Sequence, residues 1–305
     1  MLDVQVRRPV APADLTLLSS LAAAATRADG HPPFGDAVWR DLEHPGPDST
    51  LILGLVGDDV VGAVHVAPTE DPTTVVAAIL FGPDHRTPDT ATALLDTLLT
   101  DARTRAITRI TLWLFGADEQ SEALVGGAGF TVERELWQMR VGLPLGEAVR
   151  WPDGVEVRAF EPGRDEDAWL VVNNRSFRDD PDQGGWTLET LRAREAERWF
   201  DPQGFLLAFD DGGLAGFCWT KVHPPAPPSE PEPLGEIYVI GVDPDRRGIG
   251  LGRALVLGGL ISLHDRGVRV GMLFVDAANT AGVGLYRVLG FETARVDRAY
   301  GREVA

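Results

Sequence analysis

The stretch from residue 236 to residue 256, EIYVIGVDPDRRGIGLGRALV, constrains the fold more than any other part of the chain. A run of β-favouring apolar residues ends at Val-Asp-Pro, and Gly248, Gly250 and Gly252 then lead into a helical pattern. Glycines let a ligand approach the backbone closely, and a helix N-terminus carries roughly half a positive charge. The segment therefore predicts a strand, a turn and a helix whose first amides hold an anion such as a pyrophosphate.

Two common phosphate-binding motifs do not fit this segment. A Walker-type loop requires Gly-Lys-Ser/Thr, which does not follow these glycines. In a Rossmann domain the glycines come after the first strand of a βαβ unit, whereas here they follow a predicted hairpin of residues 205–211 and 213–222. The glycine-rich turn thus belongs to a different kind of α/β domain.

The length of 305 residues predicts more than one domain, because single hydrophobic cores stop growing below this size. With 44% hydrophobic and 24% charged residues, each half is able to bury a core. Turn residues near Trp151 mark the boundary, which predicts domains at 1–145 and 152–305. The alternation of strands, helices and antiparallel hairpins predicts a mixed α/β fold.

The two halves resemble each other in their order of elements. Each is expected to end with an apolar strand, a short helix and Gly-Phe before a last strand, GGAGFTVERE in the first half and RVLGFETARV in the second. The parallel favours an internal duplication of about 150 residues. Chance similarity is the alternative, since Gly-Phe turns are common.

Charge and cysteine content limit the partners and the compartment. A formal net charge of −18 and a pI near 4.7 argue against nucleic acid and anionic membranes, because both are bound through Lys and Arg. The single cysteine, Cys218, lies in an alternating apolar segment, where a buried thiol is a simpler reading than a nucleophile. The start of the chain has no signal-peptide pattern, so a cytoplasmic protein is expected. No metal site is expected.

The glycine-rich segment resembles the acyl-CoA pyrophosphate loop of the GCN5-related N-acetyltransferases, or GNAT family. The family pattern Val-x-Pro-Asp-x-Arg-x-x-Gly-x-Gly is matched by Val242, Pro244, Asp245, Arg247, Gly250 and Gly252. Downstream, NTAGVGLYRVLGF is similar to the family's next element, in which an Asn near a helix start precedes a Tyr and a Gly-Phe. The resemblance implies two tandem GNAT-like domains and acetyl-CoA as co-substrate.

Several strings between residues 172 and 256 are more specific. VNNRSF, DQGGW, WFDPQGFLLAF, GFCWTKVHP and LGEIYVIGVDP resemble, in this order, the mycothiol synthases, which are tandem acetyltransferases with the competent site in the C-terminal half. The resemblance implies acetylation of the cysteinyl amine of a small pseudo-disaccharide thiol. No residue spacing identifies this acceptor.

An amine must lose a proton before it attacks a thioester, so the site needs a base and an acid for the leaving thiolate. Glu236, at the start of the strand before the loop, is the predicted base; the alternative is a solvated carboxylate. Tyr286 lies seven residues after Asn279, and the resemblance implies that it is the acid. The alternative is a tyrosine whose ring simply packs in the core. A bulge or parting of the strand at residues 240–242 would free an amide to polarise the carbonyl.

The predicted acetyl-CoA contacts follow the loop and the next helix. They are Ile240, Gly241, Val242, Arg247, Gly248, Ile249, Gly250, Leu251, Gly252, Arg253, Asn279, Gly282 and Gly284. The resemblance implies acceptor contacts at Asp182 and Lys221, which could instead be surface charges, and at Asp36 of the first half. Glu236 is also expected to meet the acceptor, and Phe274 stands where the family pattern suggests a Tyr.

The corresponding loop in the first half, LFGPDHRTPDTATALL, has no Gly-x-Gly, and Pro88 removes an amide donor. We therefore expect a mainly structural first domain and a monomer that binds acetyl-CoA in its second domain. Two alternatives stay open: an acetyltransferase for another amine, such as an aminoglycoside or a peptide N-terminus, and an acetyl-CoA sensor without turnover.

Overall fold

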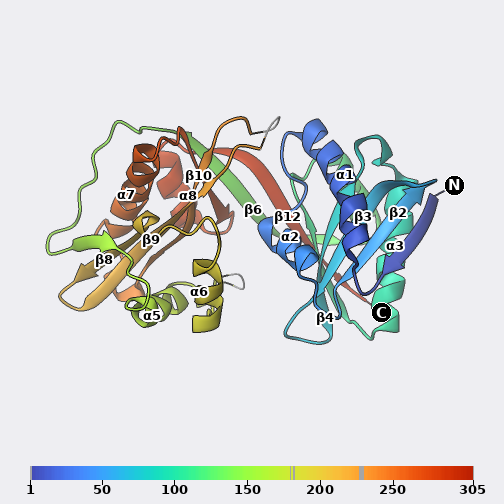
Figure 1. Ribbon diagram of the computed structural model, residues 1–305, viewed down its shortest axis with the longest axis horizontal. Helices are drawn as coiled ribbons and strands as arrows, with labels where there is room; N and C mark the ends of the chain where they lie inside the picture. Colours follow the sequence, from blue (N-terminus) through green and yellow to red (C-terminus); the bar gives the residue numbers. More distant parts are fainter. Residues whose placement is uncertain (1, 179, 181–182, 227–229, 305) are drawn as a thin grey trace. The chain divides into compact units, whose positions relative to one another are not determined.

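The computed structural model describes residues 2–178, 180, 183–226 and 230–304, and Figure 1 shows the arrangement of its helices and strands. The chain divides into two compact units. The first comprises Met1–Trp137, Asp276–Ala278 and Ala294–Ala305, and the second comprises Gln138–Val275 and Asn279–Thr293. The final segment of the chain therefore packs with the first unit, although it follows the second in sequence.

The first unit contains a mixed sheet in the order β1-β2-β3-β4-β5-β12-β6. Its elements are β1 (Leu2–Arg7), α1 (Pro12–Asp29), α2 (Asp36–Glu43), β2 (Thr50–Val56), β3 (Asp59–Pro68), β4 (Thr74–Phe81), η1 (Pro83–His85), α3 (Pro88–Thr104), β5 (Arg109–Leu114), α4 (Glu119–Gly127) and β6 (Thr131–Gly142). The last strand, β12 (Glu292–Glu303), pairs antiparallel with β5 from Arg298 to Glu303.

The second unit contains the order β6-β11-β10-β9-β8-β7. Its elements are β7 (Glu156–Ala159), α5 (Glu166–Ser176), α6 (Leu188–Glu195), η2 (Pro202–Gly204), β8 (Phe205–Asp210), β9 (Gly213–His223), β10 (Leu234–Val242), η3 (Pro244–Arg246), α7 (Leu251–Asp265), β11 (Val270–Asp276) and α8 (Thr280–Val288). The mixed α/β architecture and the hairpin of β8 and β9 confirm the fold class predicted from the sequence.

Alternation along the strands builds a core on each face of the sheet. In the first unit, Leu51 and Leu53 of β2 pack with α1 and α2, while Ile52 packs with α3. In the second unit, Phe217 and Trp219 of β9 belong to an aromatic core with α5 and α6. Burying such large rings supplies much of the stabilisation of a core.

The opposite face of the second sheet is covered by α7. The helix lies very close to β9, because a Cβ added at Gly259 would stand only 2.5 Å from the Sγ of Cys218. Cys218 is fully buried, and burial raises the pKa of its thiol to about 12. The prediction of a buried, structural cysteine is confirmed.

The parallel pairing of β10 with β11 stops in the middle of β10. Register partners run only from Leu234 with Val270 to Ile237 with Leu273. On the other side, β10 stays paired with β9 as far as Val242, with a register shift between Ile237 and Val239. Among the described residues, the carboxyl-terminal half of β10 therefore presents an edge on the β11 side without a partner strand in this register.

Candidate active site

The loop after β10 has the geometry of an open anion cradle. Gly248 and Gly250 have φ values of 87° and 85°, which other residues adopt at a cost. A Cβ at either position would meet no atom within 4 Å. Gly250 is the N-cap of α7 and offers no capping side chain, and the first turn carries no acidic residue. The first amides of α7 can therefore be satisfied by an anionic ligand.

The loop is fixed by two arginines, one that reaches it from α5 and one of its own that reaches β8. Arg175 of α5 contacts Asp243 at 3.0 Å and Asp245 at 2.7 Å. Arg246 contacts Asp210, at the end of β8, at 2.6 Å. Hydrogen bonds from these arginines lower the pKa values of Asp245 and Asp210. Neither Arg175 nor Asp210 was among the predicted site residues. Arg175 lies in the string VNNRSF, but nothing in that string indicates a partner 70 positions away.

Other residues predicted to contact the cofactor differ in their contacts within the protein. Arg253 forms a two-point ion pair with Glu147, with both contacts at 2.9 Å. An Nη2 of Arg247 lies 3.5 Å from the carbonyl oxygen of Ser176. Gly241 is required by packing, because a Cβ there would lie 2.8 Å from the ring of Phe217. Leu251 is buried and Ile249 is 53% exposed.

Glu236, the predicted base, is the third residue of β10 and is 7% exposed. Its Oε2 lies 2.6 Å from Nε2 of His223 at the end of β9. In the antiparallel register Glu236 faces Lys221, whose Nζ lies 5.0 Å from the ring centroid of Trp199 and 5.7 Å from that of Tyr238. The structure thus brings Glu236 and Lys221 together and adds His223, which the sequence analysis missed.

Tyr286, the predicted acid, lies on α8 and is 8% exposed. Its ring centroid is 5.7 Å from that of Phe291. Burial raises the pKa of Tyr286 to about 12, and the Cys218 thiol acts in the same direction. The phenol therefore keeps its proton at neutral pH, as a proton donor to a thiolate must.

The remaining predicted residues have separate surroundings. Asn279 caps α8, accepting a hydrogen bond from the amide of Gly282 at 3.0 Å. Phe274 is a half-buried residue of β11. Asp36 begins α2 in the first unit. Asp182 lies outside the described residues. Gly284 has open space where a Cβ would stand.

The matching position in the first unit is closed to an anion by its own side chains. Helix α3 is capped by Thr87, whose hydroxyl accepts from the amide of Thr90 at 3.3 Å, and Pro88 takes the first helical position. Arg86 in the loop is held by Asp29 and Asp118. The Thr87 hydroxyl thus satisfies an amide at the start of α3, whereas the N-cap of α7 in the second unit has no capping side chain.

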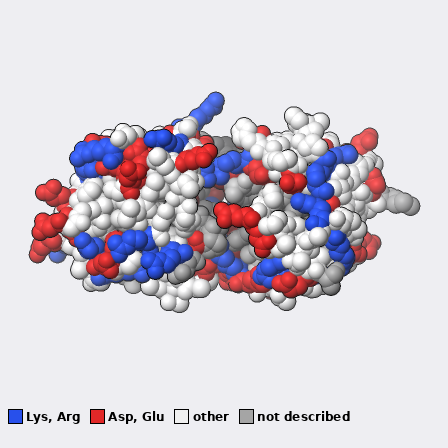
Figure 2. All heavy atoms as spheres, turned by 90° about the horizontal axis from the view of Figure 1, so that it is seen from below, with Lys and Arg blue, Asp and Glu red and all other residues white. Residues whose placement is uncertain are grey.

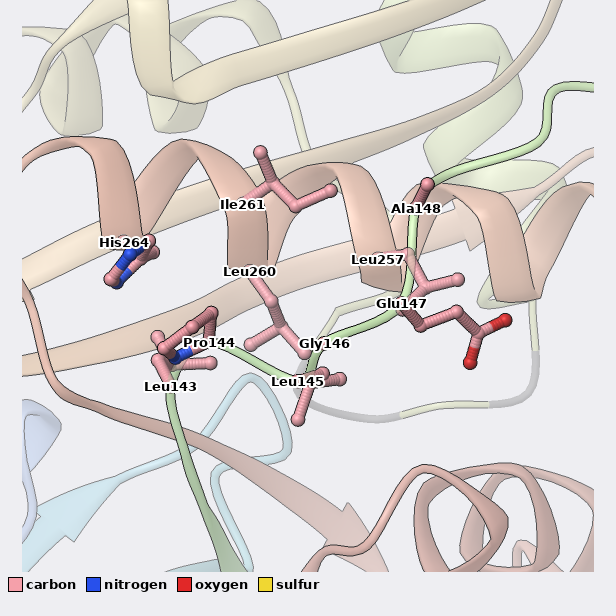
Figure 3. Close-up of a pocket in the computed structure, with 10 residues that line it drawn as sticks. All are labelled: Leu143, Pro144, Leu145, Gly146, Glu147, Ala148, Leu257, Leu260, Ile261 and His264. Atoms are coloured by element: carbon pink, nitrogen blue, oxygen red, sulfur yellow. The ribbon is translucent and has the colours of Figure 1, made fainter.

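A cavity of about 210 Å³ lies along α7, away from Glu236. Figure 3 shows how residues 143–148 run beside the helix, with Leu257 and Leu260 turned toward them. The lining is mostly apolar and the only carboxylate, that of Glu147, is paired with Arg253. None of the predicted catalytic residues lines this cavity.

The surface carries side chains of both charges. Figure 2 shows basic side chains interspersed with acidic ones on one face of the molecule. Among the described residues, no helix is long and apolar enough to cross a membrane. The same residues contain no group of three or more His, Cys, Asp or Glu side chains arranged to hold a metal ion.

Comparison with known proteins agrees with this geometry. The model of the acetyltransferase (GNAT) family matches twice, at residues 16–130 and 171–291. The mycothiol acetyltransferase of Thermobispora bispora is 43% identical over 99% of this chain and 100% of its own length. That of Thermomonospora curvata is 45% identical over 92% of this chain and 91% of its own.

Solved structures show the same tandem fold. A GCN5-related N-acetyltransferase from Sphaerobacter thermophilus superimposes with a TM-score of 0.77 at 26% identity, over 99% of this chain and 96% of that one. A tandem GNAT protein from the clavulanic acid biosynthesis pathway gives a TM-score of 0.74 over 99% of each chain, at 20% identity. The two matched domains and the full-length relatives lead to one conclusion: the chain is a tandem acetyltransferase of the GNAT family, in the group of the mycothiol acetyltransferases.

Proposed function

We propose that this enzyme transfers acetyl from acetyl-CoA to the cysteinyl amine of 1D-myo-inositol 2-(L-cysteinylamino)-2-deoxy-glucopyranoside, giving mycothiol. The observation that carries the proposal is full-length identity of 43% to a mycothiol acetyltransferase, together with an open loop at Gly248–Gly250 in the second unit. The family supplies the acetyl donor, and the acceptor follows from the relatives' name.

In the proposed reaction, the pyrophosphate of acetyl-CoA binds the amides at the start of α7. The unpaired edge of β10 beyond Ile237 is where the pantetheine would add its own hydrogen bonds. One amide of this edge would polarise the thioester carbonyl and stabilise the oxyanion. Ile240, Gly241 and Val242 contribute through this backbone, as the packing of Gly241 against Phe217 suggests.

Glu236 accepts the proton of the acceptor ammonium, and the nitrogen lone pair attacks the thioester carbon. When the carbon–sulfur bond breaks, the thiolate takes the phenol proton of Tyr286, and the phenolate regains a proton from the second N–H of the acceptor nitrogen. Glu236 lies on the same face of the sheet as Trp219. Cys218 lies on the opposite face, which α7 covers, and its thiol affects the pKa of Tyr286. Base and acid would therefore approach the thioester from opposite faces of the sheet, where β10 and β11 part.

The first unit has a structural role in this proposal, because Thr87 and Pro88 occupy the position of its pyrophosphate loop. Calorimetry with acetyl-CoA should give a stoichiometry near one per chain. Two sites of equal affinity would contradict the assignment of the cofactor to the second unit alone. The monomeric state and the acceptor contacts of Asp36 and Asp182 are further parts of the proposal.

A further inference from the structure

We propose that His223 is a positioning residue that orients Glu236 and carries the proton of the reaction from Glu236 to solvent. The inference rests on the proposed function of Glu236 as general base. Nε2 of His223 lies 2.6 Å from Oε2 of Glu236, the distance of a strong, charge-assisted hydrogen bond. Such a bond selects one rotamer of the carboxylate, which fixes the direction in which it meets the amine.

The register places His223 correctly for this role. In the antiparallel ladder His223 pairs with Leu234, two residues before Glu236, so the two side chains lie on the same face of the sheet. The side chain of His223 is 25% exposed, whereas that of Glu236 is 9% exposed. The ring therefore connects a nearly buried carboxylate with water.

The proton balance requires an exit of this kind. The acceptor enters as an ammonium, R–NH₃⁺, and leaves as an amide, R–NH–CO–CH₃, so its nitrogen gives up two protons. The departing thiolate takes one of them, by way of Tyr286, and the other must leave the site in every turnover. A carboxylate as buried as Glu236 exchanges protons with water less readily than an exposed one.

The relay itself needs no group beyond the imidazole. With the ring proton on Nδ1, Nε2 of His223 accepts the proton from the Glu236 carboxylic acid. The imidazolium then releases its Nδ1 proton to water, which leaves an ionised carboxylate hydrogen-bonded to the Nε2–H of a neutral ring. Exchange with solvent returns the ring proton to Nδ1 and resets the relay. No bond other than these N–H and O–H bonds is formed or broken.

The charged and titratable groups around the pair come from several elements. Lys221 of β9 faces Glu236, and Tyr238 of β10 accepts a hydrogen bond from Arg194 of α6 at 3.2 Å. On β11, the register partner of Glu236 is Met272, which does not titrate.

Two variants test the role. His223→Ala removes the ring, and His223→Gln keeps a hydrogen-bond donor that cannot titrate. Turnover with acetyl-CoA and the cysteinyl glycoside is measured across pH, with and without added imidazole. We expect kcat to fall about tenfold or more in both variants, with little change in the Kd of acetyl-CoA. Imidazole should restore part of the activity of His223→Ala, in proportion to its free-base form.

Each other outcome counts against the relay. Wild-type kcat and pH dependence in both variants would overturn it, as would full activity in His223→Gln, which would leave only a hydrogen-bonding role. A loss in His223→Ala that imidazole does not reduce would also overturn it, provided the melting temperature is unchanged. If the wild-type protein itself acetylates no cysteinyl glycoside, the proposed function fails instead, so the two failures are distinguishable.

Discussion

Glu236 on β10 stands directly opposite Lys221 on β9 in the antiparallel register. Both residues are 7% exposed, so an anionic and a cationic side chain are held side by side at a largely buried position. Charges buried to this degree are retained where they have a partner or a function. In the proposed function the two residues have complementary tasks: the carboxylate would take a proton from the acceptor, and the ammonium would donate to an acceptor hydroxyl.

Replacing Lys221 by Met tests the second task. Met keeps the apolar length that packs near Trp199 but cannot donate a hydrogen bond. We expect KM for the cysteinyl glycoside to rise about tenfold or more, because a hydrogen bond to a charged group is worth about 1.5–3 kcal/mol. The Kd of acetyl-CoA should not change. Arg192→Met, at an exposed position of α6, is the matched control; an unchanged KM for Lys221→Met would remove Lys221 from the acceptor site.

Replacing Glu236 by Gln keeps its shape but removes the base. The expected loss in kcat is about 10²–10⁴-fold, the range for a general base, and raising the pH should restore part of it by deprotonating the amine in solution. Steady-state kinetics across pH provide the measurement. Glu156→Gln, an exposed change on β7, should behave as wild type. Wild-type rates for Glu236→Gln at every pH would assign the base to another group.

Replacing Gly252 by Ala separates ligand approach from folding. A Cβ at Gly252 would lie 3.7 Å from Val242, an ordinary contact, so the fold should be unaffected or slightly stabilised. A pyrophosphate that touches this backbone would meet the added methyl group, and acetyl-CoA affinity should fall about tenfold or more. Gly126→Ala in α4 makes the same change in a helix of the first unit, with open space around it. Equal affinities in both variants would place the ligand elsewhere.

Replacing Tyr286 by Phe removes only the hydroxyl and leaves the packing against Phe291. We expect a smaller loss in kcat than for Glu236→Gln, because a thiol is acidic enough to leave as a thiolate. The variant also tests the raised pKa. Burial raises it from 10.0 to about 12, so this tyrosine stabilises the wild type fully below pH 10 and progressively less as the pH rises to 12.

Denaturant unfolding between pH 9 and about 12 measures this effect. Because Phe has no proton to lose, Tyr286→Phe should lose less stability across this range than the wild type does. An equal loss in both proteins would show that Tyr286 does not ionise with the shifted pKa.

The sequence was sufficient for features that depend on local patterns. The hairpin turn after Asp210, the helix after Gly250 and the buried Cys218 follow from turn chemistry, helix-start signals and alternation, which act over a few residues. The tandem domains followed from the repeated order of elements together with the resemblance to a family.

Features that depend on tertiary contacts were not predictable in the same way. The final strand was expected to belong wholly to the second half, yet Arg298–Glu303 pairs with β5 of the first unit. The register shift lies between Ile237 and Val239, earlier than residues 240–242, where a bulge was considered. Arg175 with Asp243 and Arg253 with Glu147 join residues far apart in sequence, and single-sequence patterns contain no signal for such pairs.

The most direct test of the account is incubation of the purified protein with acetyl-CoA and the synthetic cysteinyl glycoside, followed by mass spectrometry and NMR of the product. The expected product is heavier by one acetyl group, carried on the cysteinyl nitrogen, with equimolar release of CoA thiol. Acetyl-CoA binding without transfer, or acetylation only of a different amine such as an aminoglycoside or a peptide N-terminus, would contradict it.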